Sequence, residues 1–390
     1  MLKVQVAARL FCVLAVLLST PMLYRQMYDP NRRHPLNWDH KVSTRSAVDP
    51  NCACTDPTTN KTYDFCYSFN QTVRGARLNC DALAHIKQLG LLDTPTPQIT
   101  PLDAAANVSL NVTHNPPILT GASSNHYQEL RHAIGSTQRA FPHNRLIVYD
   151  FGLAKPMLDE LRSFCNIEIR TFDFSRWPKD VRQMYGYRWK PIIYALSTHE
   201  FPSGFWWIDS SIRWNHNRVE YLYNNIKRGQ RAPYVLIEYT GHSVYAATNP
   251  GVYKYIVTDT SQLKTVGMYS GGFAFIVRNE ITLNVLKWLV LCALTHDCLN
   301  PPDSRLACSF KADRWTRYAH CHRFDQSVMN VLLANQMQFV SQSYTTEADG
   351  KQLASFFVVR RSDSGPEPIA NETCLQLGVK HCACEIVHHR

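Results

Sequence analysis

The chain has 390 residues, a formal net charge of +10, 45% hydrophobic residues, 18% charged residues and 13 cysteines. The hydrophobic share excludes a mainly disordered chain, and the sequence has no heptad or solenoid period, which excludes coiled coils and repeat arrays. Thirteen cysteines without zinc-finger spacing favour an oxidising compartment over the cytosol.

The basic excess is divided between two parts of the chain. Residues 1–50 carry seven basic and three acidic groups, a surplus of four, and residues 121–350 carry twenty-five and nineteen, a surplus of six. Neither part contains the block of Lys and Arg that is typical of a nucleic-acid-binding arm. The charge therefore predicts no nucleic-acid partner, and a surface suited to a nucleotide diphosphate or an acidic glycan.

Residues 1–24 predict a cytoplasmic tail with a signal-anchor, or a signal peptide. Lys3 and Arg9 precede an apolar run over residues 10–23 that is broken only at residues 19–21. The run is short for a membrane span of about 20 residues, yet no small-x-small cleavage site follows it. An uncleaved anchor predicts a single-pass type II protein of the Golgi or ER membrane with a lumenal domain. A cleaved signal predicts a secreted protein.

Residues 25–117 predict a glycosylated stem, because they are rich in Pro, Asn, Thr and Asp and poor in periodic apolar runs. We interpret the twelve cysteines outside the apolar run as disulfide partners, with a small stapled knot between Cys52 and Cys80. Zinc bound by the C-x-C pairs and by residues 320–322 is the less favoured alternative, because C-x-C lacks the usual spacing. Lumenal exposure also suits the five Asn-x-Ser/Thr sequons, which begin at Asn60, Asn70, Asn107, Asn111 and Asn371.

Residues 118–390 predict one α/β domain with a Cys-rich C-terminal tail. Buried or alternating apolar runs predict strands at 118–121, 145–149, 167–172, 205–208, 234–238 and 272–277. Helices are predicted between these strands at 125–141, 156–165 and 191–201, and after the last strand at 281–294 and 325–335. This alternation predicts a mostly parallel or mixed sheet with helices on both faces. Ligands of such sheets bind at the carboxyl ends of the strands, where we expect Asp150 and Asp209.

Two segments could hold a cation or phosphates. Asp209 ends the buried run Trp-Trp-Ile, so its carboxylate could hold a divalent cation at the sheet edge. The alternative is a loop carboxylate that caps the next helix. Upstream, Arg188 and Lys190 lie at a helix start, where they could neutralise phosphates or pair with Asp209. The alternative for them is an ordinary exposed pair.

Two further segments could lie beside a bound ligand. Gly271 and Gly272 open an apolar strand, where they would let a ligand approach the backbone closely or would form a simple turn. Asp325 begins a helix, and Gln326 follows it. Since aspartate is a favoured N-cap residue, a structural role for Asp325 is the alternative.

The order of these segments resembles the retaining glycosyltransferases of the family-8 type, which have a GT-A fold. The resemblance covers residues 118–340, where a lysine-bearing helix, a strand ending in Asp209, a strand led by two glycines and the motif Asp-Gln-x-x-x-Asn follow one another. The segments 149–153, 187–191 and 208–211 more closely resemble an uncharacterised, nematode-expanded group of secretory-pathway proteins that contain a domain of unknown function.

The resemblance implies roles for individual residues. Asp209 matches the first metal-binding aspartate of the family, and Asp325 with Gln326 matches the catalytic pair at the reacting face of the sugar. Ser211 stands where a second aspartate is expected, and a serine hydroxyl is a poorer ligand for Mn²⁺ or Mg²⁺ than a carboxylate. The donor-binding set that the resemblance implies is Arg188, Lys190, Asp209, Ser211, Gly271 and Gly272. Candidates by position for a further metal ligand are His381, His388 and His389.

The sequence thus predicts a hexosyltransferase-like enzyme that transfers a sugar from a nucleotide-sugar donor to a lumenal glycan or glycoprotein. Retention of configuration is implied by the resemblance alone. The alternative is a catalytically decayed protein that keeps the fold and binds glycans, either at a membrane or after secretion. Ser211 is the feature that favours this alternative, because it leaves the metal motif incomplete.

Overall fold

The computed structural model describes residues 48–69, 73–94, 110–346 and 357–359. The anchor or signal expected at residues 1–24 lies outside them, as do three of the sequons, those at Asn70, Asn107 and Asn371. The other two sequon residues, Asn60 and Asn111, are exposed. Within the described part, no helix combines the length and the apolar character needed to cross a membrane.

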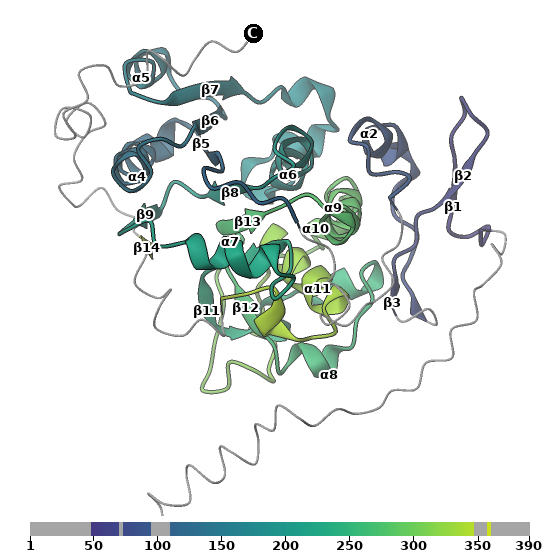
Figure 1. Cartoon of the computed structure of the whole chain (residues 1–390). Helices are drawn as coiled ribbons and strands as arrows, with labels where there is room; N and C mark the ends of the chain where they lie inside the picture. The colour runs from purple at the N-terminus through teal and green to yellow at the C-terminus, as the bar shows by residue number, and fades with distance from the viewer. Residues whose placement is uncertain (1–47, 70–72, 95–109, 347–356, 360–390) are drawn as a thin grey trace, which may run out of the picture. The chain divides into compact units, whose positions relative to one another are not determined.

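A six-stranded sheet runs through the domain in the order β10-β13-β8-β5-β6-β7. β5 pairs in parallel with β6 and β8, and β6 pairs in parallel with β7. β13 is antiparallel to both of its neighbours, β8 and β10, so it is the strand that makes the sheet mixed. The predicted architecture is confirmed (Figure 1). The strands are β5 (Ile118–Ala122), β6 (Leu146–Asp150), β7 (Ile167–Thr171), β8 (Phe205–Ile208), β10 (Tyr234–Leu236) and β13 (Phe273–Ile276).

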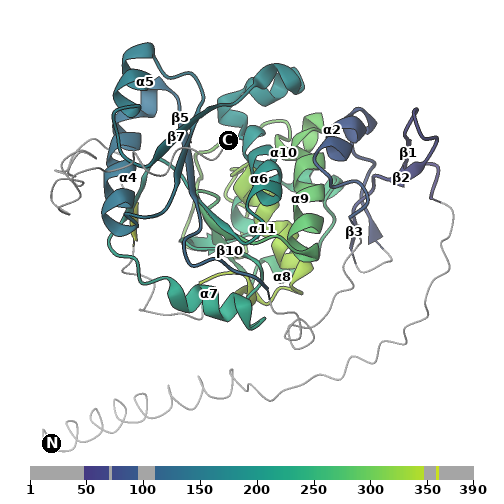
Figure 2. The ribbon, with the colours of Figure 1, turned by 45° about the horizontal axis from the view of Figure 1, so that its top comes forward.

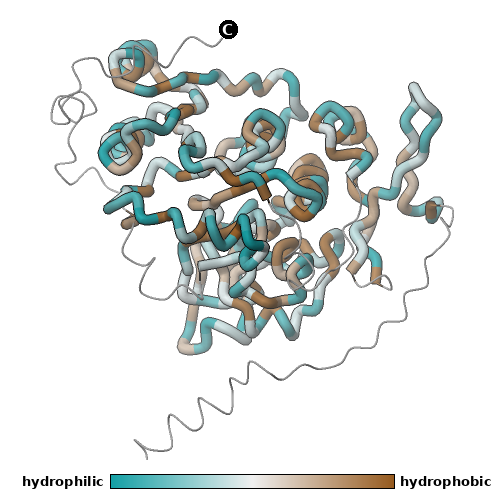
Figure 3. The backbone as a smooth tube through the Cα atoms, viewed as in Figure 1, coloured by the Kyte–Doolittle hydropathy of each residue, from teal (hydrophilic) through white to brown (hydrophobic). Residues whose placement is uncertain are grey.

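Helices cover both faces of this sheet. α4 (Tyr127–Ala140) and α5 (Lys155–Leu161) lie on one face, and α6 (Trp189–Glu200), α9 (Glu280–Ala293) and α11 (Asp325–Gln336) lie on the other (Figure 2). Their apolar side chains form two core clusters, one on each face. The most hydrophobic parts of the backbone accordingly gather in the central strands and in α9 (Figure 3). The sheet is therefore buried on both sides, as a largely parallel sheet requires.

The β8 sequence Phe-Trp-Trp-Ile shows why such a strand must be covered twice. Successive side chains of a strand point to opposite faces, so Trp206 joins one core cluster and Trp207 joins the other. Both rings are fully buried. The Trp206 indole donates to the Tyr223 hydroxyl at 2.8 Å, while the Trp207 indole reaches past the strand end to Asp209. The burial of β8 thus fixes the position of the residue that follows it.

The first described residues, 48–69 and 73–94, pack against this domain. They contain the short strands β1 (Ala53–Thr55), β2 (Thr62–Asp64), β3 (Ser68–Phe69) and β4 (Val73–Arg74) and the helix α2 (Leu83–Gln88). Tyr67 contacts Trp288 of α9 edge to face, and its hydroxyl accepts a hydrogen bond from Asn335 at 3.2 Å. Ile86 is fully buried in the core cluster that α9 and α11 share. This described part of the expected stem therefore shares the core of the sheet domain.

The remaining elements close the edges of the domain. β11 (Tyr239–Ser243) pairs with β12 (Gly267–Tyr269), and β9 (Ile212–Trp214) pairs with β14 (Phe357–Val359). The other helices are α7 (Glu220–Lys227), α8 (Thr260–Leu263) and α10 (His296–Leu299).

Four disulfides confirm the reading as structural pairs for eight of the nine described cysteines, and Cys165 belongs to none of the four. Two lie among the first described residues, Cys52–Cys66 and Cys54–Cys80. The others are Cys292–Cys298 and Cys308–Cys321. The zinc alternative is wrong for the first C-x-C pair and for Cys321, because their sulfur atoms are bonded to sulfur. The second C-x-C pair lies outside the described residues.

If α2 shares the domain core, the cavity left by removing one of its buried side chains must destabilise the whole domain. We expect Ile86→Ala to lower the free energy of unfolding by about 2–5 kcal/mol, measured by urea denaturation. Val73 of β4 is 47% exposed, so Val73→Ala should change the free energy of unfolding by less than about 0.5 kcal/mol. A separate calorimetric transition that alone responds to Ile86→Ala would contradict this packing.

Candidate active site

The candidate site lies where two neighbouring strands meet at one edge of the sheet. β8 ends at Ile208 and the antiparallel β13 begins at Phe273, and these two residues are directly paired. Asp209 therefore follows β8 at the same edge at which Gly272 precedes β13. The Asp209 amide donates to the Gly272 carbonyl at 2.7 Å. This is the carboxyl end of the parallel strands, the edge at which such sheets bind ligands.

A buried lysine joins the two sides of the site. Lys190, in the first turn of α6, is 2% exposed. Its ammonium nitrogen lies 3.0 Å from Oδ1 of Asp209 and 3.3 Å from Oδ2 of Asp325. It also donates to the Gly271 carbonyl at 3.3 Å. The expected pairing of Lys190 with Asp209 is present, and the alternative of an exposed lysine is wrong.

Two aromatic residues hold the polar groups around this lysine. The Trp207 indole donates to Oδ1 of Asp209 at 2.8 Å, so this oxygen accepts from both the indole and Lys190. The Tyr194 hydroxyl donates to the Gly271 carbonyl at 3.2 Å. The side chain of Asp209 is nevertheless 38% exposed. Asp209 therefore has one anchored oxygen and still faces solvent, and no helix follows it for its side chain to cap, because β9 comes next.

The glycine pair is required by close approach. A Cβ on Gly272 would lie 2.5 Å from Oδ2 of Asp209, and one on Gly271 would lie 3.0 Å from Oδ2 of Asp325 and from the Gln326 side chain. Contacts as short as the first do not occur between a real Cβ and an oxygen. Two residues without side chains thus let the carboxylates of β8 and α11 come close to the backbone before β13.

The N-terminus of α11 supplies the other half of the site. Asp325 is the first residue of the helix and is 4% exposed. Phe324 occupies the N-cap position with a φ of 48°, and no side chain caps the helix, so the N-cap alternative for Asp325 is wrong. Gln326 accepts a hydrogen bond at Oε1 from the Gly271 amide at 3.3 Å. Its Nε2 is buried and has no hydrogen-bond partner, which leaves a donor for a ligand.

One turn further along α11, Asn330 fixes the helix to the neighbouring strand. Its Oδ1 accepts from the Tyr269 amide at 2.9 Å, and its Nδ2 donates to the Tyr269 carbonyl at 2.7 Å. The Asn330 amide thus bonds to the Tyr269 backbone as a neighbouring strand would, and it fixes the position of α11 along β12. The position of Asp325 and Gln326 over the glycine pair follows from this register.

Burial and charge act in opposite directions on the ionisable groups. Burial lowers the pKa of Lys190, but the carboxylates of Asp209 and Asp325 outweigh it and raise that pKa above its ordinary value. Burial raises the pKa of Asp325 and Asp209 adds to this effect, while the Lys190 ammonium opposes it. Lys190 is therefore a permanent cation, and Asp325 holds a proton more readily than an ordinary aspartate.

The structure corrects the expected role of Arg188. Its guanidinium is buried and donates to the carbonyls of Ala293, Thr295 and His296 at the end of α9 and the start of α10. Cations at the C-terminal end of a helix are stabilised by its exposed carbonyls. Arg188 thus anchors two helices. Its guanidinium binds these carbonyls and not the glycine pair or Asp209.

Two other expected residues lie near the edge of the sheet. Ser211 lies two residues after Asp209, in the turn before β9, and is half-buried. Asp150 ends β6 as expected, but its Oδ1 accepts from the amides of Gly152 and Leu153. Asp150 therefore holds the loop after its own strand, and of these two strand-end aspartates it is Asp209 that pairs with Lys190.

The described residues do not form a metal site around Asp209. A hard cation such as Mn²⁺ or Mg²⁺ takes several oxygen ligands, but Lys190 already lies between the two carboxylates. The one described group of three candidate ligands is Cys52, Asp64 and Cys66, and its two cysteines are joined in a disulfide. The candidate histidines lie outside the described residues: His381, His388 and His389.

Residue patterns alone missed one member of the site. Tyr194 lies four residues after Lys190 on α6, and side chains at this spacing share a helix face. Once Lys190 is placed in a site, the same spacing points to Tyr194. Burial raises its pKa well above the usual value, so the hydroxyl stays a donor.

Comparisons with known proteins give a family match over part of the chain. A family profile described as "Protein of unknown function (DUF1647)" matches residues 52–195. No curated protein sequence matches the chain.

Several solved glycosyltransferase structures are similar to the chain at low identity. The bifunctional enzyme WbbM is 13% identical with a TM-score of 0.33, over 58% of this chain and 39% of WbbM. The galactosyltransferase LgtC, solved with donor and acceptor sugar analogues, is 15% identical with a TM-score of 0.31, over 55% of this chain and 70% of LgtC. GlyE of Streptococcus pneumoniae is 11% identical with a TM-score of 0.34, over 62% of this chain and 47% of GlyE. Function is therefore inferred below from the geometry of the site.

The buried ion pairs predict strong coupling between Lys190 and Asp325. Lys190→Met leaves two carboxylates without their cation, so we expect it to cost about 3–5 kcal/mol of stability. Asp325→Asn should restore part of this loss in the double variant, with a coupling energy of about 1–3 kcal/mol. Urea denaturation of the four proteins in a double-mutant cycle measures it. Additive effects of the two substitutions would contradict the geometry.

The raised pKa of Asp325 also predicts a pH dependence. Because the folded pKa lies above the usual value of 3.8, the contribution of Asp325 to stability is present below that value and is lost as the pH rises through the folded pKa. Asp325→Asn cannot titrate, so its stability relative to the unsubstituted protein should increase between about pH 4 and about pH 7. Denaturation curves across this range test the sign. A relative gain by the unsubstituted protein over the same range would show that the carboxylate is stabilised instead.

Proposed function

We propose that this protein is a glycosyltransferase that transfers a sugar from a nucleotide-sugar donor to a glycan or glycoprotein acceptor. One observation carries the proposal. A buried ammonium ties a solvent-facing carboxylate after β8 to a buried carboxylate at the start of α11, beside two residues without side chains. The order of these residues along the chain is also the order that resembles retaining transferases.

The donor sugar would lie over Gly271 and Gly272, between Asp209 and the start of α11. The missing side chains give the ligand access to the backbone there. Gln326 offers its unpartnered amide to a sugar hydroxyl or a phosphate oxygen, and a buried donor without a partner is costly until a ligand accepts from it. The N-terminal end of α11 adds a positive potential that suits the diphosphate.

Lys190 would act as a positioning residue. Since it is 2% exposed, its ammonium acts on the donor through the carboxylates that it holds. Fixing Asp209 and Asp325 before the donor arrives avoids reorganisation during the reaction, which is the main way in which an enzyme site stabilises developing charge. Asp325 would face the anomeric carbon, where the transition state of glycosyl transfer acquires oxocarbenium character.

Charge compensation would come from the protein more than from a metal. Asp209 is the one carboxylate of the described site that faces solvent, and Ser211 replaces the second. We therefore expect donor binding to survive the removal of divalent metal. Retention of configuration is part of the proposal and is supported by the resemblance of the Asp-Gln motif.

The cellular setting is proposed from the cysteines and the leader. Four disulfides among the described residues suit the oxidising lumen of the secretory pathway. We propose a Golgi or ER enzyme held by residues 1–24, or a secreted one if these residues are cleaved. Asn60 and Asn111 are exposed, as N-glycosylation would require.

A thermal-shift screen of the full-length protein with UDP- and GDP-sugars, with Mn²⁺ or with EDTA, tests the proposal. We expect at least one donor to raise the Tm in both conditions and Asp209→Asn to reduce the affinity by at least about tenfold, as for one charge-assisted contact. Asp259→Asn is the matched control, because Asp259 caps α8 and asparagine caps a helix equally well.

Three outcomes separate the alternatives. No shift with any donor would reject the enzyme and leave the decayed, glycan-binding protein. A shift that requires Mn²⁺ would keep the donor site but reject charge compensation by the protein. Equal losses of donor affinity in Asp209→Asn and Asp259→Asn would show that Asp209 does not belong to the donor site.

A further inference from the structure

A long irregular loop leads directly into the candidate site. Residues 300–324 connect α10 to α11 without a helix or a strand. Loops of more than about 15 residues without secondary structure are uncommon in compact domains, and they often bind a ligand or cover a site. The last residue of this loop, Phe324, is followed by the Asp325–Gln326 pair.

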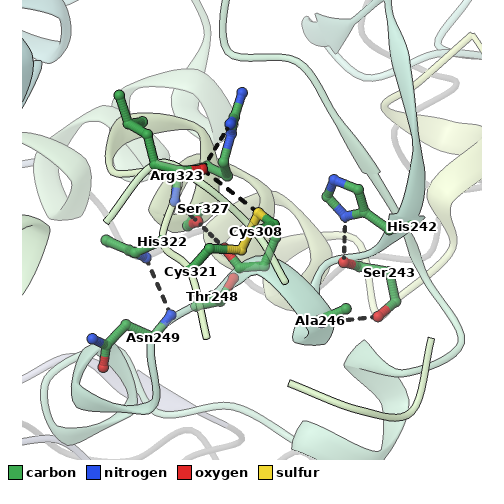
Figure 4. Close-up of a disulfide and its surroundings, with 12 residues drawn as sticks. His242, Ser243, Ala246, Thr248, Asn249, Cys308, Cys321, His322, Arg323 and Ser327 are labelled. Atoms are coloured by element: carbon green, nitrogen blue, oxygen red, sulfur yellow. Dashed lines mark hydrogen bonds between the residues drawn. A yellow bond between two sulfur atoms is a disulfide. The ribbon is translucent and has the colours of Figure 1, made fainter. Parts of the chain in front are cut away.

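The loop is fixed to the domain at several points. The Cys308–Cys321 disulfide closes it on itself, and the Ala319 amide donates to the Ala246 carbonyl at 2.8 Å. Ser243, at the end of β11, donates from its amide to the Arg314 carbonyl at 3.1 Å and from its hydroxyl to the Trp315 carbonyl at 2.6 Å. Figure 4 shows the disulfide in the same region as Ser243 and Ala246. The loop therefore presents a preformed surface.

That surface is basic. Residues 300–324 contain five cations and two carboxylates, a surplus of three, and all five cations lie within residues 305–323. Asp303 is exposed near the start of the loop. Asp313 is used within the loop, where it accepts hydrogen bonds from the Trp315 and Thr316 amides. Four of the cations are exposed, and no ion pair involving them is found among the described residues: Arg305, Lys311, Arg314 and Arg317. Arg317 is nevertheless close enough to Asp313 to help lower the pKa of that carboxylate.

An aromatic side chain lies between these cations in the sequence. Trp315 is 38% exposed, although most tryptophans of the described chain are buried. Its neighbour Arg314 stacks on the Phe310 ring at 4.3 Å, so the guanidinium is held in place. An exposed indole offers an apolar face for a sugar ring, and guanidinium groups bind carboxylate or sulfate in a bidentate manner. The combination suits a sugar that carries negative charge.

The basic surface is continuous with the site. The Phe324 ring lies 5.9 Å from the Tyr187 ring, and the Lys190 ammonium lies 5.6 Å from the centre of the same ring. Arg314 and Arg323 are both close enough to His242 to lower its pKa in addition to the effect of burial. Positive charge therefore extends from the middle of the loop to the residue that precedes Phe324.

We propose that the loop of residues 305–323 binds the acceptor, and that the acceptor is an anionic glycan, sulfated or rich in uronic acid. Binding of the glycan follows from the loop alone, whereas its role as an acceptor rests on the proposed transferase function. Trp315 would stack on a sugar ring while Arg314 and Arg317 pair with its anionic groups. This arrangement would bring the chain end of the glycan to the start of α11.

The test compares three oligosaccharides of equal length on the immobilised full-length protein: a sulfated heparin fragment, its chemically desulfated form and a neutral chitin fragment. We expect the heparin fragment to bind most tightly, and Arg314→Gln/Arg317→Gln to weaken its binding about tenfold or more, as for the loss of two charge-assisted contacts. Lys155→Gln/Arg162→Gln removes the same charge from the start of α5 and from the residue that follows it, at the opposite end of the domain (Figure 1), and should weaken binding less than about twofold.

Equal losses of heparin affinity in the two double variants would show that net charge alone causes the binding, and would overturn the proposal. Binding of the neutral fragment as tightly as heparin, or loop-dependent binding to vesicles of anionic lipid but not to heparin, would overturn it as well. Trp315→Ala should weaken binding of the heparin fragment without changing the Tm shift that a nucleotide sugar causes. If no nucleotide sugar binds but loop-dependent heparin binding persists, the transferase function fails and the glycan surface stands.

Discussion

The burial of one ammonium group between two carboxylates organises the site of this protein. Lys190, Asp209 and Asp325 come from a helix start, a strand end and a second helix start that lie far apart in the sequence. Ionised groups are costly to bury unless each has its partner, so these three elements can pack only in an arrangement that brings the charges together. The same requirement excludes side chains at Gly271 and Gly272, because either Cβ would crowd a carboxylate. The packing of the three charged groups and the space for a ligand above the two glycines thus have the same cause.

The sheet provides the edge on which this cluster is built. Because β13 runs against its neighbours, its beginning meets the end of β8, and the glycine pair lies beside Asp209. The alternation of the two tryptophans in β8 then buries one ring on each face, and the second of them donates to Asp209. An arrangement held by so many buried contacts leaves little freedom to the two carboxylates. That rigidity is what a transferase needs for the donor, since preorganised groups cost no reorganisation in the transition state.

Much of this could be predicted from the sequence, and the failures have physical reasons. The six strands of the main sheet, the helices α4, α5, α6, α9 and α11 and the edge position of Asp209 follow from apolar runs of the right length and period. Arg188 could not be assigned in this way, because it lies just before α6 and its side chain takes another direction, to the end of α9. The packing of residues 48–69 and 73–94 was hidden as well, since a few buried residues such as Ile86 are spread through a polar stretch. Partners distant in sequence leave no periodic signal, and neither does the antiparallel direction of β13.

We place donor and acceptor on two sides of the start of α11, with the donor over the glycine pair and an anionic glycan on the basic loop before Phe324. A crystal structure of the protein with an intact nucleotide-sugar analogue would test the position of the donor. We expect the sugar between Asp209, Gly271 and Asp325, with the Gln326 amide donating to it and Lys190 still buried beneath the carboxylates. A nucleotide sugar bound away from this edge of the sheet, with the Gln326 amide still unpartnered, would contradict this placement of the donor.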